Sequence, residues 1–125
     1  MVSVRYLVND VPGAIEFYTK CLGFELKQQF GSAMAIVTKE HLNLWLAGPA
    51  SSAAKPMPDG RQPAPGGWNR IVLQVNDLVT RVPELRSQQV KFRNEIVEGP
   101  GGLQILCEDP SGNAIELFQP KTTGR

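Results

Sequence analysis

The chain opens with a strict alternation of apolar and polar positions, which is the period of a strand with one buried face. Two sets of side chains point in opposite directions, Val2, Val4, Tyr6 and Val8 on one side and Ser3, Arg5 and Leu7 on the other. Asn9-Asp10 then supplies a helix N-cap and Gly23 a C-cap, and apolar residues recur at helical spacing between them (Ile15, Tyr18, Leu22). Three more segments, 24–30, 33–38 and 42–47, are predicted to be strands.

The same order of elements returns later in the chain. Val8-Asn9-Asp10 recurs as Val75-Asn76-Asp77, again between a strand and a helix. The first strand of this repeat is predicted from the alternation over 70–75, and the helix after it carries Leu78, Val82, Leu85 and Val90. Three more strands are predicted at 92–97, 103–107 and 114–118. Repetition of motif, order and element type predicts an α+β fold of two βαβββ modules in one domain, 1–125. Module 1 covers 1–47 and module 2 covers 68–120.

A proline-rich loop, 48–67, connects the modules. It holds five prolines, Pro49, Pro56, Pro58, Pro63 and Pro65, which exclude a regular helix or a central strand. A loop of this length is either a linker or a functional segment. Two interpretations therefore stay open: a plain connection, or a lid in which Met57 and Trp68 contact a ligand.

Composition and charge exclude several partners. Hydrophobic residues make up 42% and charged residues 20% of the chain, and the formal net charge is +1 without a run of like charges. Neither a nucleic-acid footprint nor a basic membrane patch is indicated. The apolar stretches are too short to cross a bilayer, and no export signal is apparent. Cys21 and Cys107 lie in apolar segments, which favours two packed, reduced thiols in a cytoplasmic protein.

Four segments of the sequence resemble the vicinal oxygen chelate superfamily: Tyr6–Asp10, Ile15–Tyr18, Leu22–Leu26 and Asp109–Leu117. This superfamily includes glyoxalase I, extradiol dioxygenases, fosfomycin-modifying enzymes and bleomycin-binding resistance proteins. The resemblance implies that the mixed sheets of the two modules curl around a shared cleft. In the enzymes, this cleft holds a divalent metal bound by one side chain from the first and last strand of each module. The resemblance also implies a homodimer, the usual closed assembly.

The four metal positions of the family fall on Ser3, Trp45, Arg70 and Glu116. Only Glu116 is a good ligand, because arginine offers no lone pair, indole only donates, and a serine hydroxyl binds metals poorly. We therefore expect neither a metal nor another cofactor. A cleft-facing carboxylate needs a partner, and Arg70 occupies the facing position, so we predict an Arg70–Glu116 ion pair. The pair either fills the cleft floor or leaves Arg70 to hold an anionic or carbonyl oxygen of a ligand.

Aromatic and polar residues share the cleft-facing alternation. Trp45 and Phe118 are either core filling or an aromatic wall, and Arg5 and Gln74 could orient a ligand. The predicted ligand-binding set is Arg5, Trp45, Trp68, Arg70, Gln74, Glu116 and Phe118. His41, the single histidine, is predicted to lie in a surface turn, and no catalytic residue is assigned. The sequence favours a metal-free protein that sequesters an aromatic or hydrophobic natural product or drug. The alternative is a glyoxalase-like lyase or dioxygenase acting on a small substrate.

Overall fold

The computed structural model describes residues 2–122, which form two compact units. One unit comprises the chain up to Gly66 together with the turn Pro110–Asn113. The other comprises Gly67–Asp109 and the strand that begins at Ala114. Within the described residues, no helix has both the length and the apolar character needed to cross a membrane.

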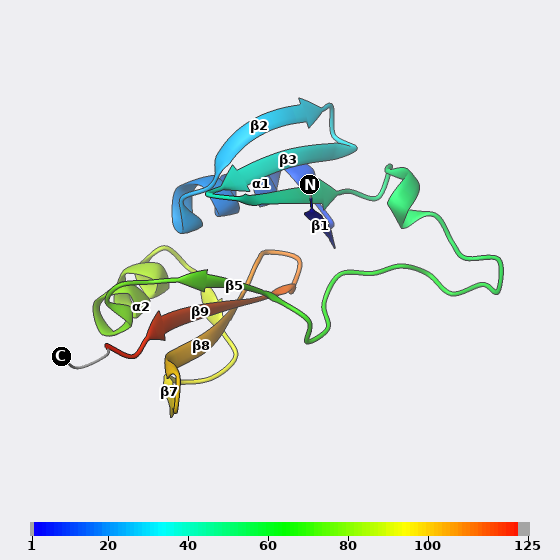
Figure 1. The fold of residues 1–125 in the computed structure, drawn as a ribbon. Coiled ribbons are helices and arrows are strands. Elements are labelled where there is room, and N and C mark those ends of the chain that lie inside the picture. The colour runs from blue at the N-terminus through cyan, green and yellow to red at the C-terminus, as the bar shows by residue number, and fades with distance from the viewer. Residues whose placement is uncertain (1, 123–125) are drawn as a thin grey trace. The chain divides into compact units, whose positions relative to one another are not determined.

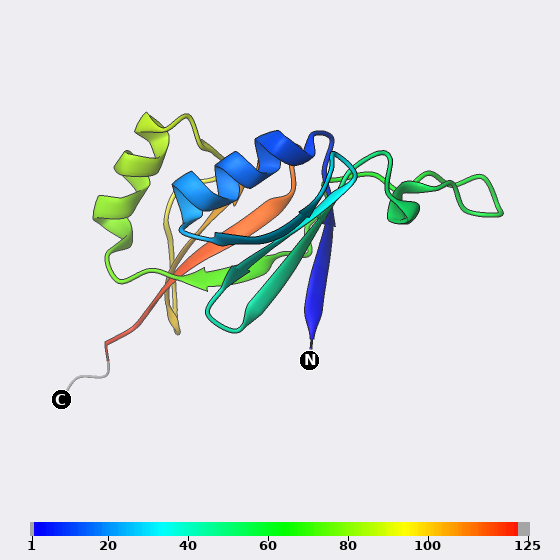
Figure 2. The same cartoon turned by 90° about the horizontal axis from the view of Figure 1, so that it is seen from above.

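The first unit is a four-stranded mixed sheet with one long helix. Its elements are β1 (Ser3–Leu7), α1 (Val11–Leu22), β2 (Glu25–Phe30), β3 (Met34–Lys39) and β4 (Leu42–Ala47). The strand order is β1-β4-β3-β2, in which β1 runs parallel to β4 and the other pairs are antiparallel. Figures 1 and 2 show α1 lying against one face of this sheet. The predicted βαβββ order of the first module is therefore confirmed.

Helix α1 begins and ends where its capping residues indicate. Asp10 is the N-cap in an extended conformation, and Gly23 ends the helix in the left-handed region at φ 77°. Tyr18 is fully buried and makes edge-to-face contacts with Phe17 and Phe24. Ile15, which was expected on the core face, is only half-buried, because the buried stripe is centred on Phe17 and Tyr18. On the exposed side, Lys20 Nζ donates to Glu16 Oε2 at 2.8 Å, and this hydrogen bond lowers the pKa of Glu16 and raises the pKa of Lys20.

The two faces of the first sheet differ in burial. The face toward α1 carries side chains that are fully buried: Ala35, Val37, Leu44 and Leu46. Side chains alternate along a strand, so the intervening residues belong to the opposite face. The pairing Arg5–Trp45–Ile36 runs across β1, β4 and β3 on that face. We call it the open face of the first sheet.

The second unit repeats the plan with shorter edge strands. Its elements are β5 (Ile71–Gln74), α2 (Leu78–Ser87), β6 (Lys91–Phe92), β7 (Val97–Gly99), β8 (Gly102–Glu108) and β9 (Ala114–Pro120). The order is β5-β9-β8-β6, with β7 also paired to β8, and β5 is parallel to β9. One face carries the buried residues Ile71, Leu73, Ile105, Cys107, Ile115 and Leu117. The face with the alternate residues is the open face of the second sheet.

Two predicted boundaries in the second module are wrong. The strand expected at 92–97 is divided into β6 and β7, because the Asn94 side chain accepts a hydrogen bond from the Leu106 backbone N–H at 3.0 Å. A side chain thus takes the place of a backbone acceptor in the ladder. Helix α2 ends at Ser87, so Val90 lies beyond it, although its side chain is still buried.

The connecting loop folds on itself within the first unit. It contains a 3₁₀ turn, Ser52–Ala54, and a tip closed by a hydrogen bond from Met57 N to Arg61 O at 2.8 Å. Gln62 Nε2 donates to Ala54 O at 3.1 Å and joins the two arms of the loop. These bonds give the loop an ordered conformation without a regular helix or strand of its own.

The turn before β9 is held by its asparagine. Asn113 Nδ2 donates to Leu7 O at 2.7 Å, and its Oδ1 accepts from Gly66 N at 2.8 Å. Ser111 Oγ accepts from Asn9 N at 2.8 Å. A single buried side chain therefore joins the end of β1 and the end of the loop. Neither cysteine forms a disulfide, and both side chains are buried.

Candidate functional site

The open face of the first sheet presents an arginine stacked on a tryptophan. Arg5 and Trp45 are register partners on β1 and β4, and the guanidinium carbon lies 4.9 Å from the indole centroid. A cation over an indole face is attracted by the ring quadrupole. Trp45 is half-buried, so its remaining surface is accessible. The strand alternation predicted for both residues is confirmed, while their role in ligand binding stays a prediction.

The open face of the second sheet carries the predicted ion pair. Arg70 Nε and Nη2 lie 3.1 and 3.0 Å from Glu116 Oε1. The carboxylate side chain is 11% exposed and the guanidinium side chain 30% exposed. Arg70 also donates from Nη1 to the Trp68 carbonyl oxygen at 3.2 Å. The Arg70–Glu116 prediction is therefore confirmed: Arg70 immediately precedes β5, and Glu116 lies on β9, which pairs with β5.

The other predicted residues of the second module lie beside this pair. Register places Val72, Glu116 and Leu106 in one row across β5, β9 and β8. The next row consists of Gln74, Phe118 and Gln104 on the same face. Phe118 is half-buried and Gln74 is exposed. Gln74 and Phe118 thus lie next to each other, as their alternation predicted.

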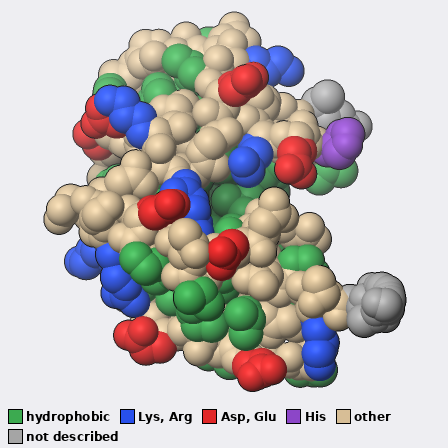
Figure 3. Space-filling view, turned by 90° about the vertical axis from the view of Figure 1, so that its left-hand side faces the viewer, with side chains coloured by type: hydrophobic (Ala, Val, Ile, Leu, Met, Phe, Trp, Pro, Cys, Tyr) green, Lys and Arg blue, Asp and Glu red, His purple; other side chains and the backbone are tan. Residues whose placement is uncertain are grey.

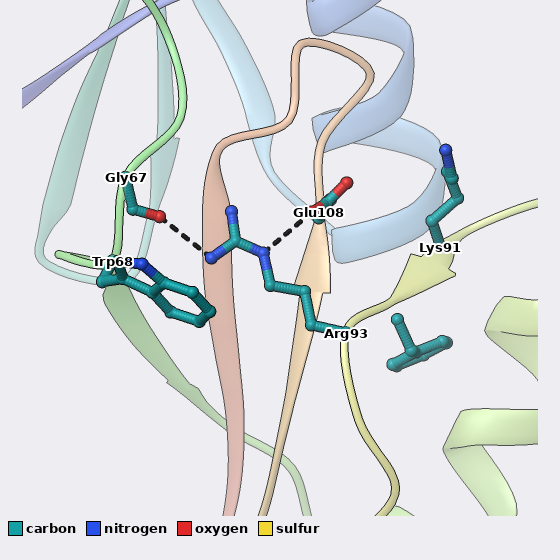
Figure 4. A pocket seen from close by; sticks show the side chains of 6 residues that line it. Gly67, Trp68, Lys91, Arg93 and Glu108 are labelled. Atoms are coloured by element: carbon teal, nitrogen blue, oxygen red, sulfur yellow. Dashed lines mark hydrogen bonds and ion pairs between the residues drawn. The ribbon is translucent and has the colours of Figure 1, made fainter.

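A second arginine–glutamate pair was not predicted. Arg93 Nε lies 2.8 Å from Glu108 Oε2, and its Nη1 donates to the Gly67 carbonyl oxygen at 2.9 Å. The guanidinium carbon also lies 4.6 Å from the Trp68 ring (Figure 4). The alternation of β8 indicates that Glu108 shares the face of Leu106. No sequence signal placed Arg93 beside it, because Arg93 follows the break after β6.

The residue types at the family's metal positions do not fit a divalent metal. Ser3 and Trp45 belong to the first unit, and Arg70 and Glu116 to the second. Glu116, the one good ligand, directs Oε1 at a guanidinium. Residues 2–122 contain no cluster of three or more histidine, cysteine or acidic side chains suited to a metal. His41 lies in a turn before β4 and is exposed at the surface, where it is the purple side chain in Figure 3.

On the one face that Figure 3 draws, the charged side chains of the described residues gather in no dominant patch of one sign. On the face drawn in Figure 3, lysines and arginines alternate with aspartates and glutamates. This distribution agrees with the formal net charge of +1. Strong electrostatic attraction of a polyanion needs clustered positive charge, which this face does not present.

Comparison with known proteins identifies the family. A sequence model of the glyoxalase/bleomycin resistance protein/dioxygenase superfamily matches residues 1–117. No curated protein matches the chain at a significant level.

Three solved structures illustrate the likeness. A member of the same superfamily from Sphaerobacter thermophilus DSM 20745 is 27% identical, with a TM-score of 0.74 and coverage of 94% of each chain. An antibiotic-binding protein from Streptomyces sp. CB03234 is 25% identical, with a TM-score of 0.67 and coverage of 97% of each chain. The bleomycin-binding protein of Streptomyces verticillus, solved with copper(II)-bleomycin, is 17% identical at a TM-score of 0.62 and shares the fold over 96% of this chain and 95% of its own. The chain therefore belongs to the glyoxalase/bleomycin resistance protein/dioxygenase superfamily.

Proposed function

We propose that the protein binds a small aromatic or hydrophobic molecule, a natural product or drug, without a metal. The residues that would contact the ligand lie on the open face of each sheet. Ligand sites of this kind are mostly apolar, with a few polar groups that fix orientation. On the first sheet, Trp45 would supply an apolar wall and Arg5 a polar group. On the second sheet, Phe118 would supply an apolar wall, and Arg70 and Gln74 the polar groups.

The observation that carries this proposal is the guanidinium of Arg70 against Glu116, at 3.0 Å. A divalent cation would have to displace this arginine from the one suitable carboxylate. The displaced guanidinium would then be left beside a doubly charged ion, and the two would repel each other. The remaining positions, Ser3 and Trp45, could not compensate with strong ligands.

The proposed ligand class also draws on a relative. The protein from Streptomyces sp. CB03234, 25% identical over nearly the whole chain, is described as binding an antibiotic. The stacked Arg5–Trp45 pair agrees with a planar ligand, since a guanidinium and an indole both offer flat surfaces. We assign sequestration rather than turnover to the protein.

Metal content tests the first part of the proposal. The protein is purified without chelator, and zinc, iron, nickel and manganese are measured by elemental analysis. We expect far less than one metal per chain, and no heat of binding when each metal is titrated into the protein. About one metal per chain, lost in the Glu116→Ala variant, would overturn the proposal in favour of a glyoxalase-like lyase or dioxygenase.

Ligand binding tests the second part. A panel of aromatic natural products is titrated into the Trp68→Phe variant, whose fluorescence comes from Trp45 alone. We expect saturable quenching by at least one compound. Calorimetry should show that the affinity for this compound falls by about tenfold or more when Trp45 is replaced by alanine. Binding that is equally tight without Trp45 would contradict the proposed wall.

We also propose that the protein works as a homodimer in the cytoplasm. Strand β2 supports this assembly, because all six of its residues are exposed at the sheet edge, including Leu26 and Phe30. Uncovered apolar strand edges invite pairing with another chain. Sedimentation at micromolar concentration should give about twice 13.7 kDa. A mass equal to that of one chain would refute the dimer. Two cysteines that form no disulfide agree with a reducing compartment.

A further inference from the structure

The backbone at Trp68 is held by two arginines: Arg70, which precedes β5, and Arg93, which follows β6. The consecutive carbonyl oxygens of Gly67 and Trp68 accept hydrogen bonds from Arg93 at 2.9 Å and Arg70 at 3.2 Å. Each arginine is anchored in turn by a glutamate of the sheet, Glu108 or Glu116. Charge-assisted hydrogen bonds of this kind are the stronger ones. The segment that carries Trp68 is therefore fixed to the second sheet.

The indole of Trp68 is nevertheless 67% exposed. Arg93 covers one face of the ring at 4.6 Å. Among the described residues, the indole N–H has no hydrogen-bond acceptor. A large aromatic surface that is held still and left accessible loses little conformational entropy when a ligand stacks on it. Trp68 has the properties of a preformed stacking platform.

Lys91 supplies an uncompensated positive charge nearby. Register pairs Lys91 directly with Glu108 across β6 and β8. Glu108 bonds to Arg93 instead, so Lys91 makes no ion pair within the part of the chain that the structure describes. Figure 4 shows the Arg93 guanidinium between Gly67 and Glu108, with Lys91 beyond the carboxylate. One glutamate and two cations leave the surroundings with a net charge of one positive unit.

These groups line a single hollow of about 560 Å³. Its walls are Gly67, Trp68, Lys91, Phe92, Arg93 and Glu108, all within the second unit. This volume is in the range of small-molecule sites. We propose that the hollow binds a planar aromatic anion, such as an aryl carboxylate. The ring stacks on Trp68 and the carboxylate pairs with Lys91. This site does not depend on the proposed function, because its ligand contacts, Trp68 and Lys91, are not among the residues to which the proposed function assigns the wall or the polar groups.

The test follows the indole N–H signals of both tryptophans by NMR during titration with 2-naphthoate. The Trp45→Phe variant assigns the two signals. We expect a saturable shift of the Trp68 signal, with 2-naphthamide, the neutral analogue, binding at least fivefold more weakly. Lys91→Gln should weaken naphthoate binding by about fivefold, the size of an exposed ion pair. Lys121→Gln is the matched control, since it removes an exposed lysine of the same unit that lies outside this hollow.

Each possible result decides the proposal. A naphthoate titration that leaves the Trp68 signal unmoved overturns it. Equal affinity for the amide, or equal effects of Lys91→Gln and Lys121→Gln, also overturns it, since binding would then lack a specific charge contact. Lys91 is exposed, so its variant should fold, and its thermal unfolding verifies this. The Trp45 signal reports separately on the proposed function, so the failure of one proposal is distinguishable from the failure of the other.

Discussion

The arginine side chains of this protein that form ion pairs differ in how far they are exposed to solvent. Arg70 and Arg93 pair with glutamates in partly buried surroundings, with arginine side chains 30% and 16% exposed. Arg61 pairs with Asp59 at the surface, where the arginine side chain is 84% exposed. Solvent screens exposed pairs and leaves them nearly neutral in energy. The first two pairs should therefore contribute to stability, while the third should not.

Removing either partner of the Arg70–Glu116 pair should have unequal effects. Arg70→Ala leaves the more buried group, Glu116, without its cation, so the free energy of unfolding should fall by about 3 kcal/mol. Glu116→Ala leaves an arginine that still reaches solvent and the Trp68 carbonyl, so the loss should be about 1 kcal/mol. Urea unfolding measures both. Arg61→Ala, the surface control, should change stability by less than about 0.5 kcal/mol. Equal losses in the first two variants would contradict the burial argument.

Gly102 is required by the backbone at the start of β8. Its φ is 147°, and a Cβ atom there would overlap the carbonyl oxygen of Gln119 on β9. Gly102→Ala should lower the free energy of unfolding by about 3 kcal/mol, through strain and steric overlap. The neighbouring Gly101 provides the control, since its Cβ would meet only the Phe118 ring at 3.5 Å, an ordinary contact. Gly101→Ala should cost less than about 0.5 kcal/mol in the same thermal or urea experiment.

At the scale of elements, side chains that bond to distant backbone groups shape the second module. Asn94 interrupts the edge of the sheet by accepting from Leu106 N. Asn113 ties the turn before β9 to Leu7 and Gly66. Each replaces a backbone partner that regular structure would otherwise supply. The irregular parts of this fold are therefore as specifically bonded as its strands.

Asn113→Ala should destabilise the protein by about 2–3 kcal/mol, because two hydrogen bonds of a buried side chain are lost at once. Ser111→Ala, in the same turn, removes the exposed hydrogen bond from Asn9 N and should cost less than about 1 kcal/mol. Hydrogen exchange gives a second measurement: the amide of Gly66 should exchange faster in Asn113→Ala and unchanged in Ser111→Ala. Similar unfolding midpoints for the two variants would refute the role of Asn113.

At the scale of the whole molecule, the connecting loop was expected to be either a linker or a lid formed by Met57 and Trp68. Met57 and Trp68 lie in different units and have different hydrogen-bonded surroundings. Met57 lies at a tip closed by its own hydrogen bonds with Arg61 and Gly60, in the first unit. Trp68 belongs to the second unit, where two arginines hold its backbone. The internal bonds of the tip favour the linker.

Met57→Ala should therefore leave both stability and ligand affinity nearly unchanged. The side chain is 43% exposed, so the free energy of unfolding should change by less than about 0.5 kcal/mol. The affinity for whichever aromatic compound quenches Trp45 should stay within about twofold, a difference of roughly 0.4 kcal/mol. A loss of affinity of more than fivefold at unchanged stability would identify the loop as a lid.

The sequence by itself determined the two βαβββ modules, the helix caps and the faces on which Trp45, Arg70 and Glu116 lie. These features follow from alternation, helical spacing and capping, which are local properties that each segment carries on its own. The same alternation was sufficient to predict the Arg70–Glu116 pair, because Arg70 immediately precedes β5 and β5 pairs with β9, the strand of Glu116.

The tertiary structure alone decided the break between β6 and β7, the Arg93–Glu108 pair, the fixed position of Trp68 and the bonds of Asn113. Each depends on a side chain that competes for a group far away along the chain, such as Asn94 for Leu106 N or Arg93 for Gly67 O. Which group such a side chain bonds depends on register and distance after the strands have paired. Local periodicity in the sequence does not predict it. For this reason the hollow beside Trp68 is evident only in the folded chain, and the sequence did not predict it.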